Sequence, residues 1–176
     1  MRWVVSDRFD PRALPLADRH YNRQKIGSNQ FVAPGSCLVL LTPNADALWV
    51  TSAPLAEYVR HEWAGAWVCT LFRREDECSY LASDLIKDAV AATRWRYGTP
   101  PEQGFVTFVD RSRTRSKRDP GYCYQAAGWR AIGRTKKDGL YALGLSHDEL
   151  VAVEPRPPVG AQLDLLRADA SNCIPA

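Results

Sequence analysis

A histidine and a tyrosine stand side by side near the start of the chain, as His20-Tyr21. Histidine exchanges a proton or binds a metal ion at neutral pH more readily than other side chains, and a phenol beside it adds a hydrogen-bond donor. The surrounding segment is polar and offers His20 no apolar stripe to join. Two interpretations therefore stand, a chemical role and an ordinary surface histidine.

A carboxylate ends an apolar run in the second half of the chain, where Gly104-Phe105-Val106-Thr107-Phe108-Val109 leads into Asp110. Carboxylates at the C-terminal end of a strand often face the crevice in which a sheet binds ligands. The alternative is that Asp110 caps a helix or pairs with one of the arginines that follow it.

Two tyrosines and a thiol lie among small residues in Gly121-Tyr122-Cys123-Tyr124-Gln125-Ala126-Ala127-Gly128-Trp129. This segment could place a phenol and a thiol near a substrate. Aromatic packing of a short helix on a sheet is the alternative. Cys123 has no marked base partner, so a core position is expected for it.

Basic residues are concentrated just after Asp110. Between residues 111 and 137, nine cationic side chains stand against one acid, Asp119, for a net charge of +8, whereas the whole chain carries +3 and the remainder therefore −5. The first part of this segment interleaves hydroxyls with cations, which suits phosphate contacts, and its cations are Arg111, Arg113, Arg115, Lys117 and Arg118. Neutralised DNA phosphates release counterions, so the segment predicts a DNA-binding surface. A phosphorylated cofactor and a solvated basic loop are the alternatives.

The hydrophobic pattern predicts the elements that must hold these residues. A short helix is expected to open at Asp119-Pro120-Gly121, run through residues 124–127 and end at Gly128. Strands are predicted where short apolar runs are bounded by turn residues, at 36–42, 47–51, 66–72, 104–110, 129–134 and 139–145.

One longer helix is predicted between the third and fourth of these strands. Apolar residues recur at helical spacing over 81–96, after a cap at Ser79 or Ser83 and before a stop at Gly98. The order of elements indicates an α/β (α+β) class with a mixed, mostly antiparallel sheet of about six strands flanked by helices.

Length and composition favour a single domain. The chain has 176 residues, 45% of them hydrophobic, and we expect one domain over 1–153 with its core at 36–145 and the His-Tyr segment at 18–31. The tail over 154–176 is expected to be irregular, with one or two helical turns at 163–168.

Several protein classes are excluded by what the sequence lacks. No apolar run is long enough to span a bilayer and the first residues do not read as a signal peptide, so no membrane partner and a cytoplasmic location are expected. The five cysteines are odd in number and form no C-x-x-C pair, which supports neither a disulfide framework nor a zinc finger. Phosphate-loop, H-E-x-x-H and G-x-S-x-G motifs do not occur.

The order of elements around Tyr124-Gln125-Ala126-Ala127-Gly128-Trp129 resembles the C-terminal half of the GNAT acyltransferase superfamily, over roughly residues 37–145. This resemblance implies a GNAT-like single domain. It also implies a glycine-bearing loop after the strand at 66–72, which in that superfamily cradles the pyrophosphate of coenzyme A. Here the stretch reads Arg73-Arg74-Glu75-Asp76-Glu77-Cys78-Ser79-Tyr80, with three acids and no glycine, which argues against acetyl-CoA as cofactor.

His20-Tyr21, Asp110 and the segment at 121–129 resemble segments of the Mom-type phage DNA-modification proteins, a divergent GNAT-like family. The resemblance implies an enzyme that modifies the exocyclic amine of adenine in phage DNA and so evades restriction. Its place would be the cytoplasm of a phage-infected or prophage-carrying bacterial host. The catalytic residues it implies are His20, Tyr21, Asp110 and Tyr124.

The same resemblance implies a metal, Fe(II), held by His20, Asp110 and Tyr124, whose nitrogen and oxygen donors suit that ion. The basic loop would grip double-stranded DNA, and the target base would be flipped out of the duplex. Two alternatives are an N-acyltransferase that uses acetyl-CoA on a small amine or protein, and a non-enzymatic nucleic-acid-binding module. The transferred group, its donor and the oligomeric state, a dimer included, are left open.

Overall fold

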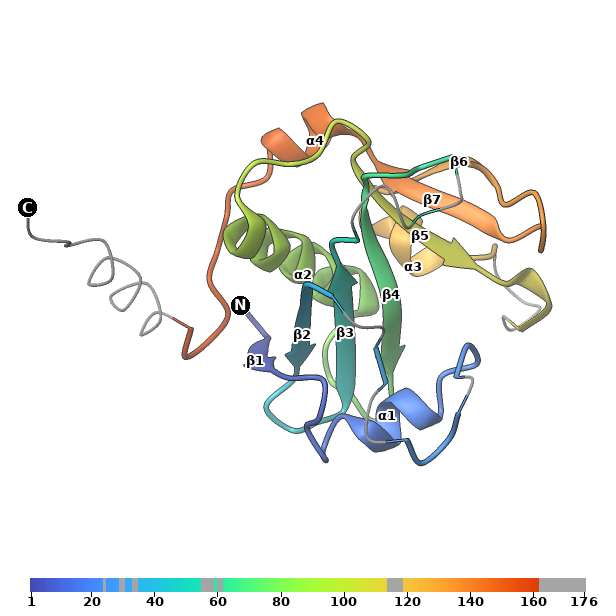
Figure 1. Ribbon diagram of the computed structural model, residues 1–176. Coiled ribbons are helices and arrows are strands. Elements are labelled where there is room, and N and C mark those ends of the chain that lie inside the picture. The colour runs from blue at the N-terminus through green and yellow to red at the C-terminus, as the bar shows by residue number, and fades with distance from the viewer. Residues whose placement is uncertain are drawn as a thin grey trace, which may run out of the picture.

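A single mixed sheet organises the molecule (Figure 1). The computed structural model describes residues 1–23, 25–28, 31–32, 35–54, 59, 62–113 and 119–161. In this part of the chain seven strands pair in the order β1-β2-β3-β4-β5-β7-β6, and all neighbours are antiparallel except β4 and β5. The strands are β1 (Val4–Ser6), β2 (Cys37–Leu41), β3 (Ala47–Ser52), β4 (Trp67–Arg74), β5 (Phe105–Val109), β6 (Arg130–Arg134) and β7 (Tyr141–Leu145).

Helices occupy the connections. α2 (Ala82–Tyr97) crosses between the parallel strands β4 and β5 and ends at Gly98, whose φ of 72° lies in the region that favours glycine. The other helices are short: α1 (Leu14–Asp18), the one-turn 3-10 helix η2 (Arg111–Arg113), α3 (Tyr122–Ala126) and α4 (His147–Val151). None of the described helices is long and apolar enough to cross a bilayer.

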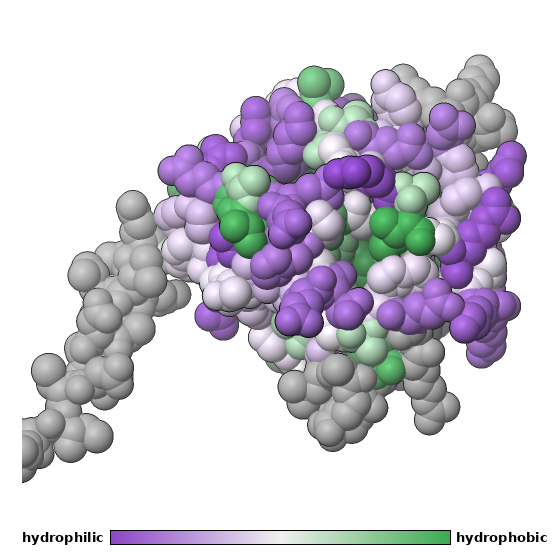
Figure 2. Space-filling model, turned by 90° about the horizontal axis from the view of Figure 1, so that it is seen from above, coloured by the Kyte–Doolittle hydropathy of each residue, from purple (hydrophilic) through white to green (hydrophobic). Residues whose placement is uncertain are grey.

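The strands β2 and β3 are buried on both faces of the sheet. Along β2, Leu38 and Leu40 join a core formed with α2 and α3, whereas Val39 and Leu41 join a second core formed with α1. A strand covered on both sides must be apolar at every position, which explains the uninterrupted run predicted over 36–42. Hydrophilic side chains cover most of the end of the molecule near α4, where hydrophobic ones form only small separate patches (Figure 2).

The sheet opens between β4 and β5. These strands pair only from Trp67↔Phe105 to Cys69↔Thr107, and beyond that point β4 continues along β3 while β5 continues along β7. A β-bulge lies at the point of parting, because the register with β3 passes from Cys69 to Leu71 and leaves Thr70 without a partner position. Bulges of this kind re-aim side chains and are common next to functional sites.

The predicted elements agree with this fold in all but a few places. All six strands and both predicted helices are present within a few residues, and the sheet is mixed and mostly antiparallel. The predicted cap of α2 is wrong, since its N-cap is Leu81 and no side chain caps it, so neither Ser79 nor Ser83 has that role. β1, α1 and α4 were not anticipated, and residues 163–168 lie outside the described residues.

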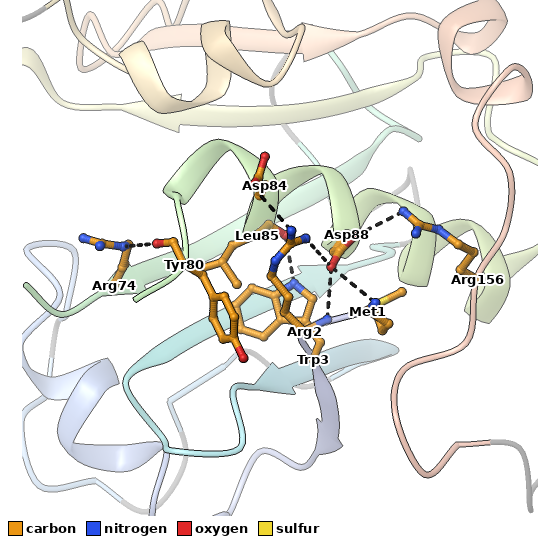
Figure 3. Close-up of polar contacts among 9 residues, drawn as sticks. All are labelled: Met1, Arg2, Trp3, Arg74, Tyr80, Asp84, Leu85, Asp88 and Arg156. Atoms are coloured by element: carbon orange, nitrogen blue, oxygen red, sulfur yellow. Dashed lines mark hydrogen bonds and ion pairs between the residues drawn. The ribbon is translucent and has the colours of Figure 1, made fainter. Parts of the chain in front are cut away.

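The segment after α4 packs on the domain through a buried carboxylate, Asp88 of α2 (Figure 3). Asp88 is 3% exposed and accepts hydrogen bonds from the Arg2 backbone (3.0 Å), from Arg2 Nη1 (2.9 Å) and from Arg156 Nη2 (3.2 Å). Val159 forms a parallel bridge with Val4 nearby. One acid therefore holds both ends of the described chain against α2.

We expect Asp88→Ala to lower the free energy of unfolding by about 1–3 kcal/mol, because it strands two partly exposed guanidinium groups beside a buried site. Asp84→Ala is the matched control, since Asp84 is 38% exposed and meets only Arg2, at 3.4 Å. Asp84→Ala should lower the free energy of unfolding by less than about 1 kcal/mol. Chemical denaturation measures both, and equal costs would contradict the role given to Asp88.

Candidate functional site

A cavity of about 300 Å³ lies where β4 and β5 part. The segment after α1 forms one side of it and α3 the other. Its lining residues are His20, Tyr21, Asn22, Cys69, Thr70, Leu71, Phe72, Thr107, Phe108, Val109, Asp119, Gly121, Tyr122, Cys123 and Tyr124. Three of the four predicted catalytic residues, His20, Tyr21 and Tyr124, are thus brought together although about a hundred positions separate the first from the last.

His20 sits in the turn that follows α1, with its ring stacked on Tyr21 at a centroid distance of 4.5 Å. Its Nδ1 accepts a hydrogen bond from the Asn22 backbone N–H at 3.2 Å, so in the neutral ring the proton resides on Nε2. Burial, and then the positive charge of Arg73, lower the pKa of His20 to about 4. The imidazole is therefore neutral at pH 7 and offers an Nε2–H donor.

The pKa of His20 predicts how stability depends on pH. In the unfolded chain His20 binds a proton near pH 6.5, whereas in the folded chain it does so only near pH 4. The unfolded state therefore holds more protons in this window, and the free energy of unfolding must fall as the pH drops from 6.5 toward 4. We expect His20→Gln to remove on the order of 1–2 kcal/mol of that fall, measured by urea titration at both pH values. If the free energy of unfolding fell by the same amount between the two pH values in His20→Gln as in the wild type, the account of a neutral His20 ring in the folded chain would be contradicted.

Tyr124 lies in α3, 7% exposed, with its hydroxyl 3.4 Å from Cys69 Sγ. Burial, and then the neighbouring Cys69 and Cys123, raise the pKa of its phenol well above the ordinary value, so the phenol stays protonated. The N-cap position of α3 strongly favours glycine. Gly121 has a φ of 75°, and a Cβ there would lie 2.2 Å from Leu143 Cδ1.

The two thiols of the cavity are held neutral. Burial raises the pKa of Cys69 to about 12 and also raises that of Cys123. Cys123 is half-buried and lines the cavity, whereas Cys69 belongs to the core. The raised pKa values keep both thiols protonated at neutral pH, and Cys123, expected in the core, lies at the border of the core rather than within it.

Asp110 follows β5 directly, as expected, and lies beside the cavity rather than among its lining residues. Burial is the main cause that raises the pKa of Tyr21, the negative charge of nearby Asp110 adds to that rise, and the Asp110 backbone acts against it. Asp110 Oδ1 also accepts hydrogen bonds from Ser112 N (2.8 Å) and Ser112 Oγ (2.7 Å). The Ser112 hydroxyl is the first cause that lowers the pKa of Asp110, so the carboxylate is ionised. The hydrogen bonds from Ser112 bear out the capping interpretation, and the catalytic role of Asp110 stays a prediction.

The described donors do not assemble a metal-binding set. No group of three His, Cys, Asp or Glu side chains that could hold an ion occurs in the described ranges. A metal-bound histidine usually donates its second ring N–H, but His20 Nδ1 is an acceptor, and the Tyr124 hydroxyl meets Cys69. Fe(II) on His20, Asp110 and Tyr124 therefore stays a prediction.

The predicted DNA-binding loop is described only in part. Arg111 and Arg113 are exposed in η2, next to Asp110, and the Arg111 Nη1 group donates to the Tyr141 hydroxyl at 3.2 Å. Arg115, Lys117 and Arg118 lie outside the described residues.

Side chains of the loop after β4 form hydrogen bonds and ion pairs with other groups of that loop and with a neighbouring arginine. Arg74 donates hydrogen bonds to the carbonyl oxygens of Cys78 and Tyr80, the latter at 2.8 Å. The Glu75 carboxylate binds the guanidinium groups of Arg73 and Arg19 at 3.1 and 2.9 Å. A pyrophosphate would need backbone N–H groups and positive charge that is not already paired with an acid. This arrangement does not favour coenzyme A.

The sequence analysis did not identify three of the residues that line the cavity between β4 and β5. Cys69, Thr70 and Thr107 line it, and Thr107 Oγ1 donates to the Cys69 carbonyl oxygen at 3.2 Å. The available signal was two threonines, each inside an otherwise apolar strand. Tyr122, which is 51% exposed at the cavity, stood in the segment at 121–129 without an assigned role.

Comparisons of the chain with protein-family models, curated proteins and solved structures found no match.

Proposed function

We propose that the chain is a DNA base-modifying enzyme with a GNAT-like domain, similar to the Mom-type proteins, which alters the exocyclic amine of adenine in phage DNA and so shields it from restriction. One observation carries the proposal. His20, Tyr21 and Tyr124 line a single cavity at the parting of β4 and β5, and Tyr21 interacts there with Asp110. These four residues are the ones that the resemblance implies. The mixed, mostly antiparallel sheet supports the GNAT-like domain.

The cavity suits a single base that has left the duplex. Its volume of about 300 Å³ lies at the lower end of small-ligand pockets. Tyr21 and Tyr122 are 38% and 51% exposed at its edge and provide ring faces on which a base can stack. The ring nitrogens of adenine are acceptors, and the His20 Nε2–H group is a donor that can bind one of them. His20 thus orients the base in this proposal and does not remove a proton from it.

The reaction needs one proton acceptor and one proton donor. The exocyclic amine is a weak nucleophile, because its lone pair is delocalised into the purine ring. It must lose a proton as its nitrogen bonds to the incoming group, and the atom that releases this group must gain one. The Asp110 carboxylate, which is ionised and near enough to raise the pKa of the Tyr21 phenol, is the proposed proton acceptor, and the protonated phenol of Tyr124 is the proposed donor.

Arg111 and Arg113 extend the site toward the DNA backbone. They follow Asp110 in sequence and are exposed, so phosphates of the strand that carries the flipped base can bind them. The proposed partner is double-stranded DNA and the proposed location the cytoplasm of a bacterial host.

An N-acyltransferase is the second candidate, because the neutral phenol of Tyr124 could equally protonate a departing thiolate. The charged side chains of the loop after β4 are already bonded to groups of that loop, which argues against an acetyl-CoA-dependent acyltransferase. A nucleic-acid-binding module without activity would not need the buried phenol.

Ligand binding separates these functions. We expect the purified protein to bind duplex DNA with a steep salt dependence, and acetyl-CoA to leave its unfolding temperature unchanged. A shift with acetyl-CoA and no binding of DNA would instead favour the acyltransferase. An active-site variant that binds DNA as the wild type does, but has lost base modification, excludes the binding module.

A further inference from the structure

A second cavity, of about 380 Å³, adjoins the candidate site. The two are neighbours, because Phe108 of β5 lines both. The second cavity lies at the end of the β6–β7 hairpin, and Trp63, Leu140, Arg134, Lys136 and Lys137 contribute to its lining. None of these residues has a part in the chemistry proposed above.

One side of the second cavity is aromatic. The rings of Trp63 and Phe108 lie 5.7 Å apart with an interplanar angle of 57°. Gly133 lets the indole approach β6 closely, since a Cβ at that position would lie 3.2 Å from the Trp63 ring. Half-buried aromatic faces of this kind stack on nucleobases irrespective of base identity.

The other side of the second cavity has a net positive charge, because the cations Arg134, Lys136 and Lys137 line it together with the acids Glu62 and Asp138. The hairpin loop with Lys136 and Lys137 is closed by hydrogen bonds from Thr135 N to Leu140 O (2.9 Å) and from Leu140 N to Thr135 Oγ1 (3.0 Å). Lys136 pairs with Glu62 at 2.8 Å, whereas no ion pair of Lys137 is found in the described part of the chain.

Two arginines from different elements meet at one hydroxyl beside this cavity. Arg134 lies over the Tyr141 ring, 4.4 Å from its centroid, and its Nη2 donates to the Tyr141 hydroxyl at 2.9 Å. Arg111 donates to the same oxygen at 3.2 Å. Both guanidinium groups thus point donors at one place, and guanidinium groups bind phosphate oxygens through strong, charge-assisted hydrogen bonds. Arg111 directly follows Asp110, so this position lies between the candidate site and the second cavity.

We propose that the second cavity binds a nucleotide of the DNA strand, with its base against Trp63 and Phe108 and its phosphate on Arg134 and Arg111. The bound nucleotide is the immediate neighbour of the base that enters the candidate site. This inference rests on the proposed function and deepens it, because the enzyme then grips two adjacent nucleotides of one strand.

The test uses fluorescence anisotropy with a labelled single-stranded oligonucleotide and an abasic strand of the same length. Arg134→Ala should weaken binding to both strands about five- to tenfold and reduce the slope of log K against log salt by about 0.7. The matched control is Arg130→Ala on the same strand β6, where Arg130 is 72% exposed and pairs with Glu149. It should bind both strands as the wild type does.

The base contact is tested on the same pair of probes. Trp63→Leu should weaken binding to the normal strand about fivefold or more, leave the salt slope unchanged, and bind the abasic strand as the wild type does. Trp63→Phe, which keeps a ring, should restore most of the affinity. The Arg134 variant, whose side chain lies at the surface, decides the proposal even if Trp63→Leu does not fold.

Equal binding by the Arg134→Ala and Arg130→Ala variants would overturn the proposal, as would equal losses on the normal and abasic strands for Trp63→Leu. Binding is measured without turnover. Absence of any base modification would therefore overturn the proposed function alone, and an unchanged Arg134→Ala variant would overturn the second cavity alone.

Discussion

Replacing Tyr124 with phenylalanine is expected to slow base modification at least about a hundredfold, because the phenol is the proposed proton donor and general acids contribute about 10²–10⁴. The ring itself packs against Trp129 and Phe72 at centroid distances of 5.3 and 6.1 Å and is retained in the variant. The variant loses the weak contacts of the hydroxyl with Cys69 Sγ and Thr107, so the free energy of unfolding should fall by no more than about 1 kcal/mol. The measurement is the rate at which a modified nucleoside accumulates in DNA.

Tyr97→Phe is the matched control for this variant. It removes the hydroxyl of a half-buried tyrosine that lies outside the cavity and accepts a long hydrogen bond from Ser36 Oγ at 3.5 Å. Its rate should match that of the wild type. A Tyr124→Phe variant as active as Tyr97→Phe would remove Tyr124 from the mechanism.

Asp110→Asn is expected to lower the rate by a similar factor, about a hundredfold, through loss of the carboxylate that accepts the proton. Asparagine caps a helix as well as aspartate does, so the two hydrogen bonds to Ser112 can persist in the variant. The substitution therefore separates the two interpretations of Asp110. A residue that only caps η2 would tolerate the change without loss of activity.

Ser112→Ala provides the opposite perturbation. It removes the hydroxyl that is the first cause of the lowered pKa of Asp110 but keeps the carboxylate. Activity at neutral pH should remain close to that of the wild type, and its acidic limb should move to higher pH, because the carboxylate becomes easier to protonate. A pH–rate profile measures this. Loss of activity at neutral pH in Ser112→Ala, with Asp110→Asn active, would reverse the assignment.

The strands could be predicted because burial on both faces leaves an apolar run that local sequence displays. β2 and β5 are such runs, and the expectation that Asp110 ends a strand followed directly from the second of them. Gly98 could be recognised as a helix stop because its positive φ is costly for other residues. These features depend on neighbours in sequence.

The cavity could not be predicted in the same way. It exists because β4 leaves β5 after Cys69 and because a bulge at Thr70 redirects the following side chains, and both depend on pairing with strands distant in sequence. β1 was missed because three half-exposed residues carry almost no pattern. α1 was missed because its five residues include a proline and have no side-chain cap, so its stability comes from Leu16 and Ala17 packing on the sheet. The resemblance named His20 and Tyr124 together, and both line the cavity, although nothing in their sequence spacing relates them.

The measurement closest to the central claim is mass spectrometry of nucleosides from plasmid DNA of bacteria that express the chain. Cells that express Tyr124→Phe and Tyr97→Phe to the same level serve as the comparison. The proposed function predicts a nucleoside of altered mass that appears at the expense of deoxyadenosine in the wild-type and Tyr97→Phe cells and is lost with Tyr124→Phe. Identical nucleosides from all three, with each protein folded and abundant, would contradict it.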